Sequence, residues 1–432
     1  MKPKLSNHFK NRSPSAIREA QIIFSNRGDK SEVDVINLAI GNISLPMHPS
    51  MIQKMKDLGN ASFPDGIVKY SPTVGTDNAR NAFLKILSSL DIDTHNIQCN
   101  ITDGGSAAME LMLLGVCGPS SLQPIMLLDP TYTNYVDFTK RLSIPIITNE
   151  RRMKDNGSFE NLDLRKIKHL IDTKKPAGLV VIPYDNPSGQ YIEKKTLIEL
   201  SKICVEKNIW IISDEAYRTL HYDDNNSYIS SIWNISENEV KGITGRRISI
   251  ESSSKVWNAC GLRIGALLTD NIDFHVKSTS EYTANLSANS IGQEIFGVLK
   301  DETKENLNLW YNSQKNYYKK IMFRLREDLE AQIPGLIISK PQAAIYFIID
   351  FKNIVNEKFD SVLFTKYCAE KGKINIENRY YSILLAPMKL FYQNKELGRT
   401  QMRLAVVEPP EKIKLTAEIL KNLFIEYKKT IT

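Results

Sequence analysis

Short apolar runs alternate with amphipathic stretches of helix length along most of this chain. The runs are rich in Ile, Val and Leu, which favours strands that are buried on both faces. They are NIQCNIT (96–102), PIMLLD (124–129), GLVVIP (178–183), IWIIS (209–213), RRISIES (246–252) and RIGALLT (263–269). Stretches such as KKTLIELSKICVEKN (194–208) separate them. The alternation predicts an α/β fold in which helices cover both faces of a mostly parallel sheet.

Ligands of such sheets bind at the carboxyl ends of the strands, so the residues that follow each run are candidates for a site. The first run leads into DGGSAAMELMLLGV (103–116), where glycines and small residues start a helix. Around Gly105, Ser106 and Ala107 the backbone N–H groups can face an anion such as a phosphate. The alternative interpretation is an ordinary tight turn between strand and helix.

Polar side chains follow the next predicted strands as well. Tyr132 comes after the second run, Asn186 precedes a proline after the third, and Asp214 ends the fourth, with Tyr217 three residues further on. Each has a simpler explanation, because Asp at a strand end is often a helix N-cap and Asn-Pro-Ser-Gly is a common turn. Their convergence on one sheet edge favours a shared ligand.

The segment ESSSKVWNACGLRIG (251–265) places a lysine in a tight connection between two predicted strands. Lys255 follows Ser252 by three residues and precedes Arg263 by eight. The edge therefore combines an amine, a carboxylate, a phenol, an amide and an anion cradle. Pyridoxal phosphate requires such a set, with a lysine for covalent attachment, an acid for its ring nitrogen and a phosphate site.

Composition narrows the class of protein further. The formal charge of +7 comes from scattered Lys and Arg residues, without the concentrated stripe of a nucleic-acid surface. Five cysteines without a CxxC pair argue against a disulfide framework or structural zinc and favour a reducing cytoplasm. Six scattered histidines give metal catalysis no support. No export signal and no run of about 18 apolar residues is found, so a membrane span is not expected.

The chain resembles the class I/II aminotransferases of the fold-type I pyridoxal-phosphate-dependent family over nearly its whole length. SSSK followed by GLRIG is similar to the family's S-x-x-K lysine motif with its downstream arginine, and DNPSG and DEAY match in order. The resemblance implies an aspartate-aminotransferase-like fold. It further implies a large α/β/α domain at 46–300, with a smaller α+β domain at 1–45 and 301–432.

Carried over position by position, the resemblance gives each candidate residue a role toward pyridoxal 5'-phosphate. Lys255 would form the covalent imine and move the proton, and Asp214 would keep the pyridine nitrogen protonated. Asn186 and Tyr217 would hydrogen-bond the phenolic oxygen of the ring, while Tyr132 would stack on its face. The phosphate would be held by Gly105, Ser106, Ala107, Ser252 and Arg263.

The C-terminal part would supply the substrate end. Arg403 lies in the predicted strand QMRLAVVEP (401–409), and an arginine there is costly to bury without a partner. The resemblance implies that this partner is the α-carboxylate of the substrate; the alternative is an arginine that points to solvent from an edge strand. GNISLPMHP (41–49) resembles the family's pocket-lining segment, which makes Gly41 and Asn42, with Asn186, candidates for substrate contacts.

The chain departs from the family pattern at one position that concerns the choice of substrate. Dicarboxylate-specific members of one subgroup carry a second arginine in the stretch corresponding to STSEYTANLSANS (278–290), where this chain has none. A second carboxylate would need another cation, and neither Lys69 nor Arg80 can be assigned to it from the sequence. The favoured reaction is aminotransfer from aspartate or an aromatic L-amino acid to a 2-oxo acid such as 2-oxoglutarate.

Two alternatives to this reaction stay open. The first is a lyase or amino-acid decarboxylase on the same fold, which would use identical cofactor residues. The second is a non-catalytic regulator, which would usually carry an added DNA-binding domain, and no segment of that length is expected before residue 40.

The segment GIVKYSPTVGTDNAR (66–80) resembles the family's Y-x-P-x-x-G element. There the tyrosine, here Tyr70, reaches the cofactor phosphate of a neighbouring subunit. The resemblance thus implies a homodimer with sites completed in trans. The simpler interpretation is a half-buried tyrosine beside a turn formed by Ser71, Pro72 and Gly75.

Overall fold

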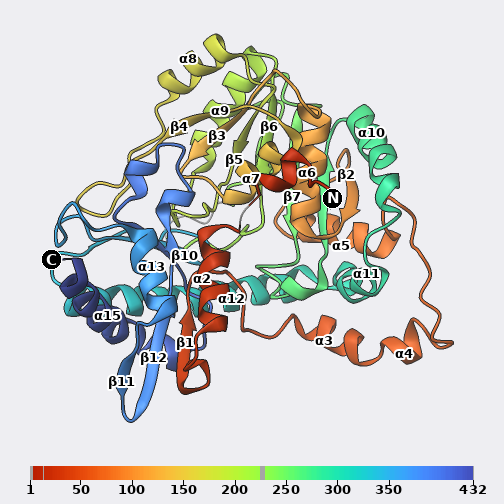
Figure 1. Cartoon of the computed structure of the whole chain (residues 1–432). Coiled ribbons are helices and arrows are strands. Elements are labelled where there is room, and N and C mark those ends of the chain that lie inside the picture. Colours follow the sequence, from red (N-terminus) through yellow and green to blue (C-terminus); the bar gives the residue numbers. More distant parts are fainter. Residues whose placement is uncertain (1–2, 13, 224–228, 432) are drawn as a thin grey trace.

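The structure, a computed structural model, describes residues 3–12, 14–223 and 229–431 of the chain. Within these ranges the strands form one large sheet and two smaller ones. Figure 1 shows the large sheet in the upper part of the view and the smaller sheets at the lower left, with the long helix α12 (Lys304–Gln332) running beneath. No described helix is both long enough and apolar enough to cross a bilayer.

The large sheet contains seven strands in the part of the chain described. Their spatial order is β2 (Gln98–Thr102), β8 (Gly265–Thr269), β7 (Arg247–Ser252), β6 (Trp210–Asp214), β5 (Gly178–Val181), β3 (Ile125–Asp129) and β4 (Ile146–Glu150). Only β8 runs antiparallel to its neighbours, and the remaining pairs are parallel. The predicted α/β fold with a mostly parallel sheet is confirmed.

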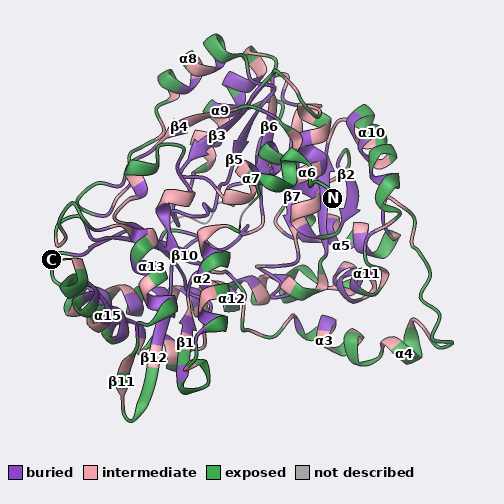
Figure 2. Ribbon diagram, in the orientation of Figure 1, coloured by how far each residue is buried: buried purple, intermediate pink, exposed green. Residues whose placement is uncertain are grey.

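Successive residues of the central strands bury against different helix layers, because side chains alternate between the faces of a strand. Ile211 belongs to the core cluster shared with helices α5, α8, α9 and α12, whereas Ile212 belongs to the cluster shared with α6, α7 and α10. Both residues are fully buried. Figure 2 shows these strands almost entirely as buried, in contrast to the exposed surfaces of α3 and α4.

The helices connect and cover the strands. They are α1 (Asn7–Lys10), α2 (Ala16–Asn26), α3 (Pro49–Lys56), α4 (Leu58–Ala61), α5 (Asp77–Ser88), α6 (Gly104–Val116), α7 (Thr133–Leu142), α8 (Leu164–Lys174), α9 (Lys194–Glu206), α10 (Ile272–Tyr282), α11 (Ser290–Gly297), α12, α13 (Ser361–Glu370), α14 (Pro410–Ile413) and α15 (Thr416–Ile431). Side chains cap several N-termini; for example, the Thr76 hydroxyl accepts from the Ala79 N–H at the start of α5.

The two smaller sheets join the beginning of the chain to its end. One contains β1 (Val33–Asn37), β12 (Arg379–Leu384) and β11 (Ile374–Ile376), and the other contains β13 (Ala386–Pro387), β14 (Gln401–Ala405), β10 (Tyr346–Asp350) and β9 (Ile337–Ile338). Strand β1 pairs in parallel with β12, so the N-terminal segment folds onto the C-terminal part. The exact domain limits at residues 45/46 and 300/301 stay a prediction.

Several strands have no counterpart among the apolar runs of the sequence. Strand β4 is only partly buried and ends in Asn149 and Glu150, as expected for the edge of a sheet. Strand β12 begins with exposed residues at Arg379 and Tyr380 and becomes buried only toward Leu384. Their weaker apolar patterns explain why the sequence did not reveal them.

Candidate active site

A cavity of about 660 Å³ opens at the carboxyl ends of the large sheet, between that sheet and the two smaller ones. Most of the residues predicted from the sequence line it. They are Gly41, Asn42, Gly105, Ser106, Tyr132, Asn186, Asp214, Tyr217, Ser252, Lys255, Arg263 and Arg403. Two predicted residues do not: Ala107 lies in the first turns of α6 outside the lining, and Tyr70 is 78% exposed on the surface.

The start of α6 and the loop after β7 form one wall of the cavity. Gly104 has a φ of +78°, and a β-carbon at this position would overlap the guanidinium of Arg263. The absence of a side chain therefore lets Arg263 lie against the helix start, where its Nη2 donates to the Asp103 carbonyl at 3.4 Å. Ser106 and Ser252 line the cavity beside them. A guanidinium, two hydroxyls and a helix N-terminus are suited to hold a phosphate.

Lys255 extends from the connection between β7 and β8 toward the N-terminal segment. Its Nζ donates a hydrogen bond to the carbonyl oxygen of Gly41. A β-carbon on Gly41 would overlap the Tyr346 hydroxyl and lie 3.1 Å from the lysine nitrogen. The glycine thus allows the backbone of this segment to approach the lysine closely.

Asp214 ends strand β6 as a buried carboxyl group at the cavity wall. The Tyr135 hydroxyl donates to its Oδ2 at 3.1 Å, and the Ala216 N–H donates to its Oδ1 at 3.2 Å. Burial raises the pKa of Asp214 to about 6, while these two hydrogen bonds act in the opposite direction. No basic side chain of the described residues forms an ion pair with Asp214. A cationic group of a ligand in the cavity would therefore stabilise the charge of this carboxylate.

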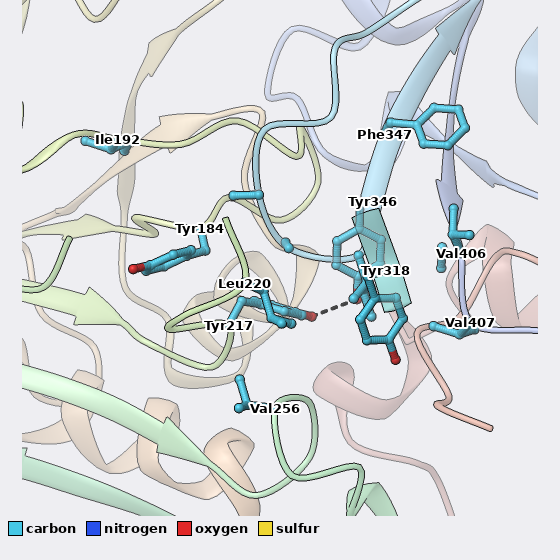
Figure 3. Close-up of a cluster of buried hydrophobic side chains, with 14 of the residues drawn as sticks. Tyr184, Ile192, Tyr217, Leu220, Val256, Tyr318, Tyr346, Phe347, Val406 and Val407 are labelled. Atoms are coloured by element: carbon cyan, nitrogen blue, oxygen red, sulfur yellow. Dashed lines mark hydrogen bonds between the residues drawn. The ribbon is translucent and has the colours of Figure 1, made fainter. Parts of the chain in front are cut away.

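A pair of tyrosines connects the large sheet to the small ones. The hydroxyl groups of Tyr217, in the loop after β6, and Tyr346, on β10, lie 2.7 Å apart, as the dashed line in Figure 3 shows. Both side chains are buried, with exposed fractions of 4% for Tyr217 and 2% for Tyr346. Burial is the main cause that raises the pKa of Tyr217 well above its ordinary value, so its hydroxyl stays protonated.

Arg403 lines the cavity from strand β14 and is only 4% exposed. Since β14 lies between β13 and β10, the arginine does not point to solvent from an edge strand. Its Nη1 donates to Asn186 Oδ1 at 2.8 Å and its Nη2 to the Ala39 carbonyl at 2.6 Å.

The guanidinium of Arg403 is held between two aromatic rings. Its Cζ lies 4.4 Å from the ring centroid of Tyr346 and 4.9 Å from that of Phe391. Its Nε is buried and has no hydrogen-bond partner among the described residues. A planar guanidinium fixed in this way can bind a carboxylate with two parallel hydrogen bonds.

The sequence did not single out several residues of the cavity. Tyr346 and Phe391 lie in apolar surroundings where aromatic residues usually indicate core. Ser15, Ile17, Arg18 and Gln21 of the α2 region also line the cavity. No motif marks them, because their place depends on how α2 packs against α13 and β13.

The fold that carries this cavity is that of the aspartate-aminotransferase-like proteins. The chain belongs to the family Aminotransferase class I and II, which matches residues 33–402. It is therefore an aminotransferase, as the resemblance in the sequence implied.

Individual relatives are distant. A probable aspartate aminotransferase from Methanocaldococcus jannaschii is 27% identical over 97% of this chain and 100% of its own length. A probable aspartate/prephenate aminotransferase from Aquifex aeolicus is 24% identical over 80% of this chain and 83% of its own length. Among solved structures, an aspartate aminotransferase of Thermus thermophilus superposes with a TM-score of 0.79 at 19% identity, covering 98% of this chain and 100% of that one. At this identity the likeness extends to the fold alone.

Proposed function

We propose that the protein binds pyridoxal 5'-phosphate in this cavity and moves an amino group between an L-amino acid and a 2-oxo acid. The observation that carries the proposal is the convergence of Lys255, the buried Asp214 and the buried Arg403 on one cavity. The bound cofactor supplies an electron-withdrawing ring that stabilises negative charge at the α-carbon of the amino acid. The residues of this chain then have to hold the cofactor, orient the substrate and move a proton.

Lys255 is the residue proposed to attach the cofactor and to carry the proton at its Nζ. Asp214 supplies the carboxylate beside the protonated ring nitrogen. The positive charge of that nitrogen offsets the free-energy cost of burying the carboxylate. The Tyr135 hydroxyl donates to this carboxyl group and would hold it in position. Tyr217 and Asn186 provide hydrogen-bond donors for the phenolic oxygen of the ring, and Tyr132 provides a ring face for stacking.

The remaining residues bind the two anionic ends of the complex. Ser106, Ser252 and Arg263, with the backbone of Gly105 and Ala107, hold the phosphate at the start of α6. Arg403 binds the substrate α-carboxylate, and Gly41, Asn42 and Asn186 complete the wall around it. The same carboxylate is present on amino acid and 2-oxo acid, so one guanidinium serves both halves of the reaction.

Aspartate or an aromatic L-amino acid is the proposed donor, with 2-oxoglutarate as acceptor and the cytoplasm as location. The names of relatives support these substrates. Several similar chains are named aspartate aminotransferase, and a chain from Saccharomyces cerevisiae that is 22% identical over 79% of this one is named probable kynurenine–oxoglutarate transaminase. The α-carboxylate site is common to all these donors.

The test is a half-reaction with the cofactor-loaded protein. Each amino acid is added separately, without any acceptor, and the absorption of the cofactor is followed as it changes from its aldehyde to its amine form. An aminotransferase releases the matching 2-oxo acid in equal amount. Release of carbon dioxide or of a β-eliminated group would instead support the decarboxylase or lyase alternative. If the protein binds the cofactor but converts no amino acid, the result would support the alternative of a non-catalytic regulator.

A homodimer is the proposed working unit. Tyr70 lies on the segment that connects α4 to α5 along the right-hand side of Figure 1. Its neighbours Ile67 and Val68 are also exposed, at 59% and 49%. Apolar side chains of an extended segment favour burial against another surface, which a second copy of the chain would provide. Tyr70 would then contribute to the phosphate site of that copy.

Subunit mixing tests this assembly. Tyr70→Arg spoils the phosphate site of the neighbouring subunit, whereas Lys255→Ala spoils the site of its own subunit. Hybrid dimers of the two variants should contain one intact site and regain part of the activity. Absence of recovery despite proven exchange would place Tyr70 in its own subunit's site, and an active monomer would exclude the dimer.

A further inference from the structure

A cluster of three buried charged side chains has no part in the proposed reaction. Its members are Glu215, Arg218 and Glu251. The Nε of Arg218 donates to Glu215 Oε2 at 2.8 Å, and its Nη2 donates to Glu251 Oε1 at 2.5 Å. One guanidinium therefore bridges a carboxylate in the loop after β6 to a carboxylate on β7.

Each member of this cluster is the immediate chain neighbour of a residue that lines the cavity. In the order Glu215, Arg218 and Glu251, these neighbours are Asp214, Tyr217 and Ser252. The cluster itself lies outside the cavity lining. Since side chains alternate between the faces of a strand, Glu251 points away from the cavity that Ser252 lines. The three charged groups thus lie directly behind the proposed cofactor site.

The backbone alone does not join the two strand ends at this point. In the described part of the chain, the last backbone hydrogen bond between β6 and β7 runs from the Glu215 N–H to the Ile250 carbonyl at 3.0 Å. Ser252 lies two residues beyond that bond and pairs with Gly265 of β8 on its other side. The Arg218 bridge is therefore a cross-link between β6 and β7 that continues past the end of their ladder.

Further hydrogen bonds hold both carboxylates of the bridge in place. Glu251 Oε1 also accepts from the Ser249 hydroxyl at 2.7 Å. The donors to Glu215 Oε1 are the hydroxyls of Ser213 and Ser231 and the N–H of Ile232. Burying such charges costs desolvation free energy, and apolar side chains of similar volume often stabilise a fold equally well. The charged bridge adds fixed geometry, because a guanidinium binds carboxylates in defined directions.

We propose that Arg218 is a positioning residue that sets the spacing between the ring site at Asp214 and the phosphate site at Ser252. The inference rests on the proposed function, because it requires one ligand that spans both sites. Such a ligand benefits from a fixed spacing, since binding at one site places its other end at the second site. A fragment that occupies a single site does not benefit from the spacing.

The test compares a whole ligand with its two parts by calorimetry on the full-length, cofactor-free protein. The whole ligand is pyridoxamine 5'-phosphate, whose amine cannot form an imine with Lys255, and the parts are pyridoxamine and inorganic phosphate. Arg218→Gln should weaken binding of the whole ligand by about tenfold or more, because the two sites no longer match its length. The affinity for each part should change less than about twofold, since each part uses one site.

Arg247→Gln is the matched control, because Arg247 forms an ion pair with Asp270 at 2.7 Å at the opposite end of β7. It removes a largely buried ion pair from the same strand and should leave all three affinities unchanged. The double variant Arg218→Met with Glu251→Gln covers the case that Arg218→Gln does not fold, since it removes the guanidinium together with one of its carboxylates. It should unfold near the temperature of the wild type and still bind the whole ligand weakly.

The outcomes separate the inference from the function beneath it. An equal loss for the whole ligand and both parts, or no loss at all, would overturn the role of Arg218 and leave the proposed function intact. Affinity of the double variant equal to that of the wild type would do the same. If the wild type binds the whole ligand no more tightly than its parts, the two sites are not occupied together, and the proposed function fails with the inference.

Discussion

The cofactor end and the substrate end of the cavity are built from different kinds of sequence. Lys255, Asp214 and Ser106 all follow strands of one sheet, so short motifs after apolar runs bring them together. Gly41 and Arg403 come from opposite ends of the chain and meet only because β1 pairs with β12. The comparison teaches that the proposed cofactor site is encoded locally, whereas the proposed substrate site depends on packing across the chain.

Lys255→Ala should cause the largest loss and tests whether the cofactor end acts as proposed. Without the amine, turnover should fall by about 10⁴-fold or more, because covalent attachment and proton transfer are lost together. Cofactor should still bind without being fixed by borohydride. Lys277→Ala, a change of an exposed lysine on α10, serves as the control and should behave as the wild type. A borohydride label on any other residue would contradict the assignment.

Asp214→Asn should cause the next largest loss at the same end. An amide cannot stabilise the protonated ring nitrogen, so kcat/KM should fall by about a hundredfold to a thousandfold, as when a preorganised charge is removed. Steady-state kinetics with a saturating cofactor concentration measures this loss. Turnover close to that of the wild type would show that the ring nitrogen has another partner.

The cofactor-free protein gives Asp214→Asn a second signature. The pKa of Asp214 is raised from 3.8 to about 6 in the folded state, so the folded protein keeps a proton that the unfolded chain has lost between these pH values. The free energy of unfolding therefore decreases as the pH rises through this window, by up to about 3 kcal/mol. Asp214→Asn should make this decrease smaller by up to about 3 kcal/mol in thermal unfolding measured from pH 4 to pH 7, while the contribution of Asp129, whose pKa burial also raises to about 6, remains. An equal decrease in the wild type and the variant would contradict the raised pKa of Asp214.

Arg403→Leu tests the substrate end. The Michaelis constants of amino acids and 2-oxo acids should both rise by about a hundredfold, because the α-carboxylate loses its buried guanidinium. Amines that lack this carboxylate should react as slowly with the variant as with the wild type. If the rate with carboxylate-free amines falls by a similar factor, Arg403 has a structural role, which its hydrogen bonds to Asn186 and Ala39 would explain.

Tyr346→Phe should have the smallest effect, because it removes one hydroxyl at the boundary between the two ends. The ring still fills the space beside Arg403, while the hydrogen bond to Tyr217 is lost. We expect a loss of about tenfold or less in kcat and a shift in the pH at which the bound cofactor changes its absorption. An unchanged spectral titration would mean that the tyrosine pair serves packing alone.

The same contrast explains how far the sequence could predict the site. Asp214 was found because it ends a strongly apolar strand, and Lys255 because it lies in a tight connection between two strands. Arg403 was found because an arginine within an apolar strand requires a partner. Tyr346 was missed because a tyrosine in a buried strand is typical of a core. Arg18 was missed because an exposed arginine on an amphipathic helix gives no signal until the packing of that helix is known.

Hydrogen-bond direction gives the tyrosine pair a further meaning. A phenol has a single proton to donate, so Tyr217 cannot donate both to Tyr346 and to the cofactor. If the proton of Tyr217 points to the cofactor oxygen, the proton on the bond between the two hydroxyls must come from Tyr346. Binding of the proposed cofactor would thereby set a direction of hydrogen bonds that runs from strand β10 through Tyr217 to the ring. The small sheet, which carries Arg403 close to Tyr346, would then be the donor side of these hydrogen bonds.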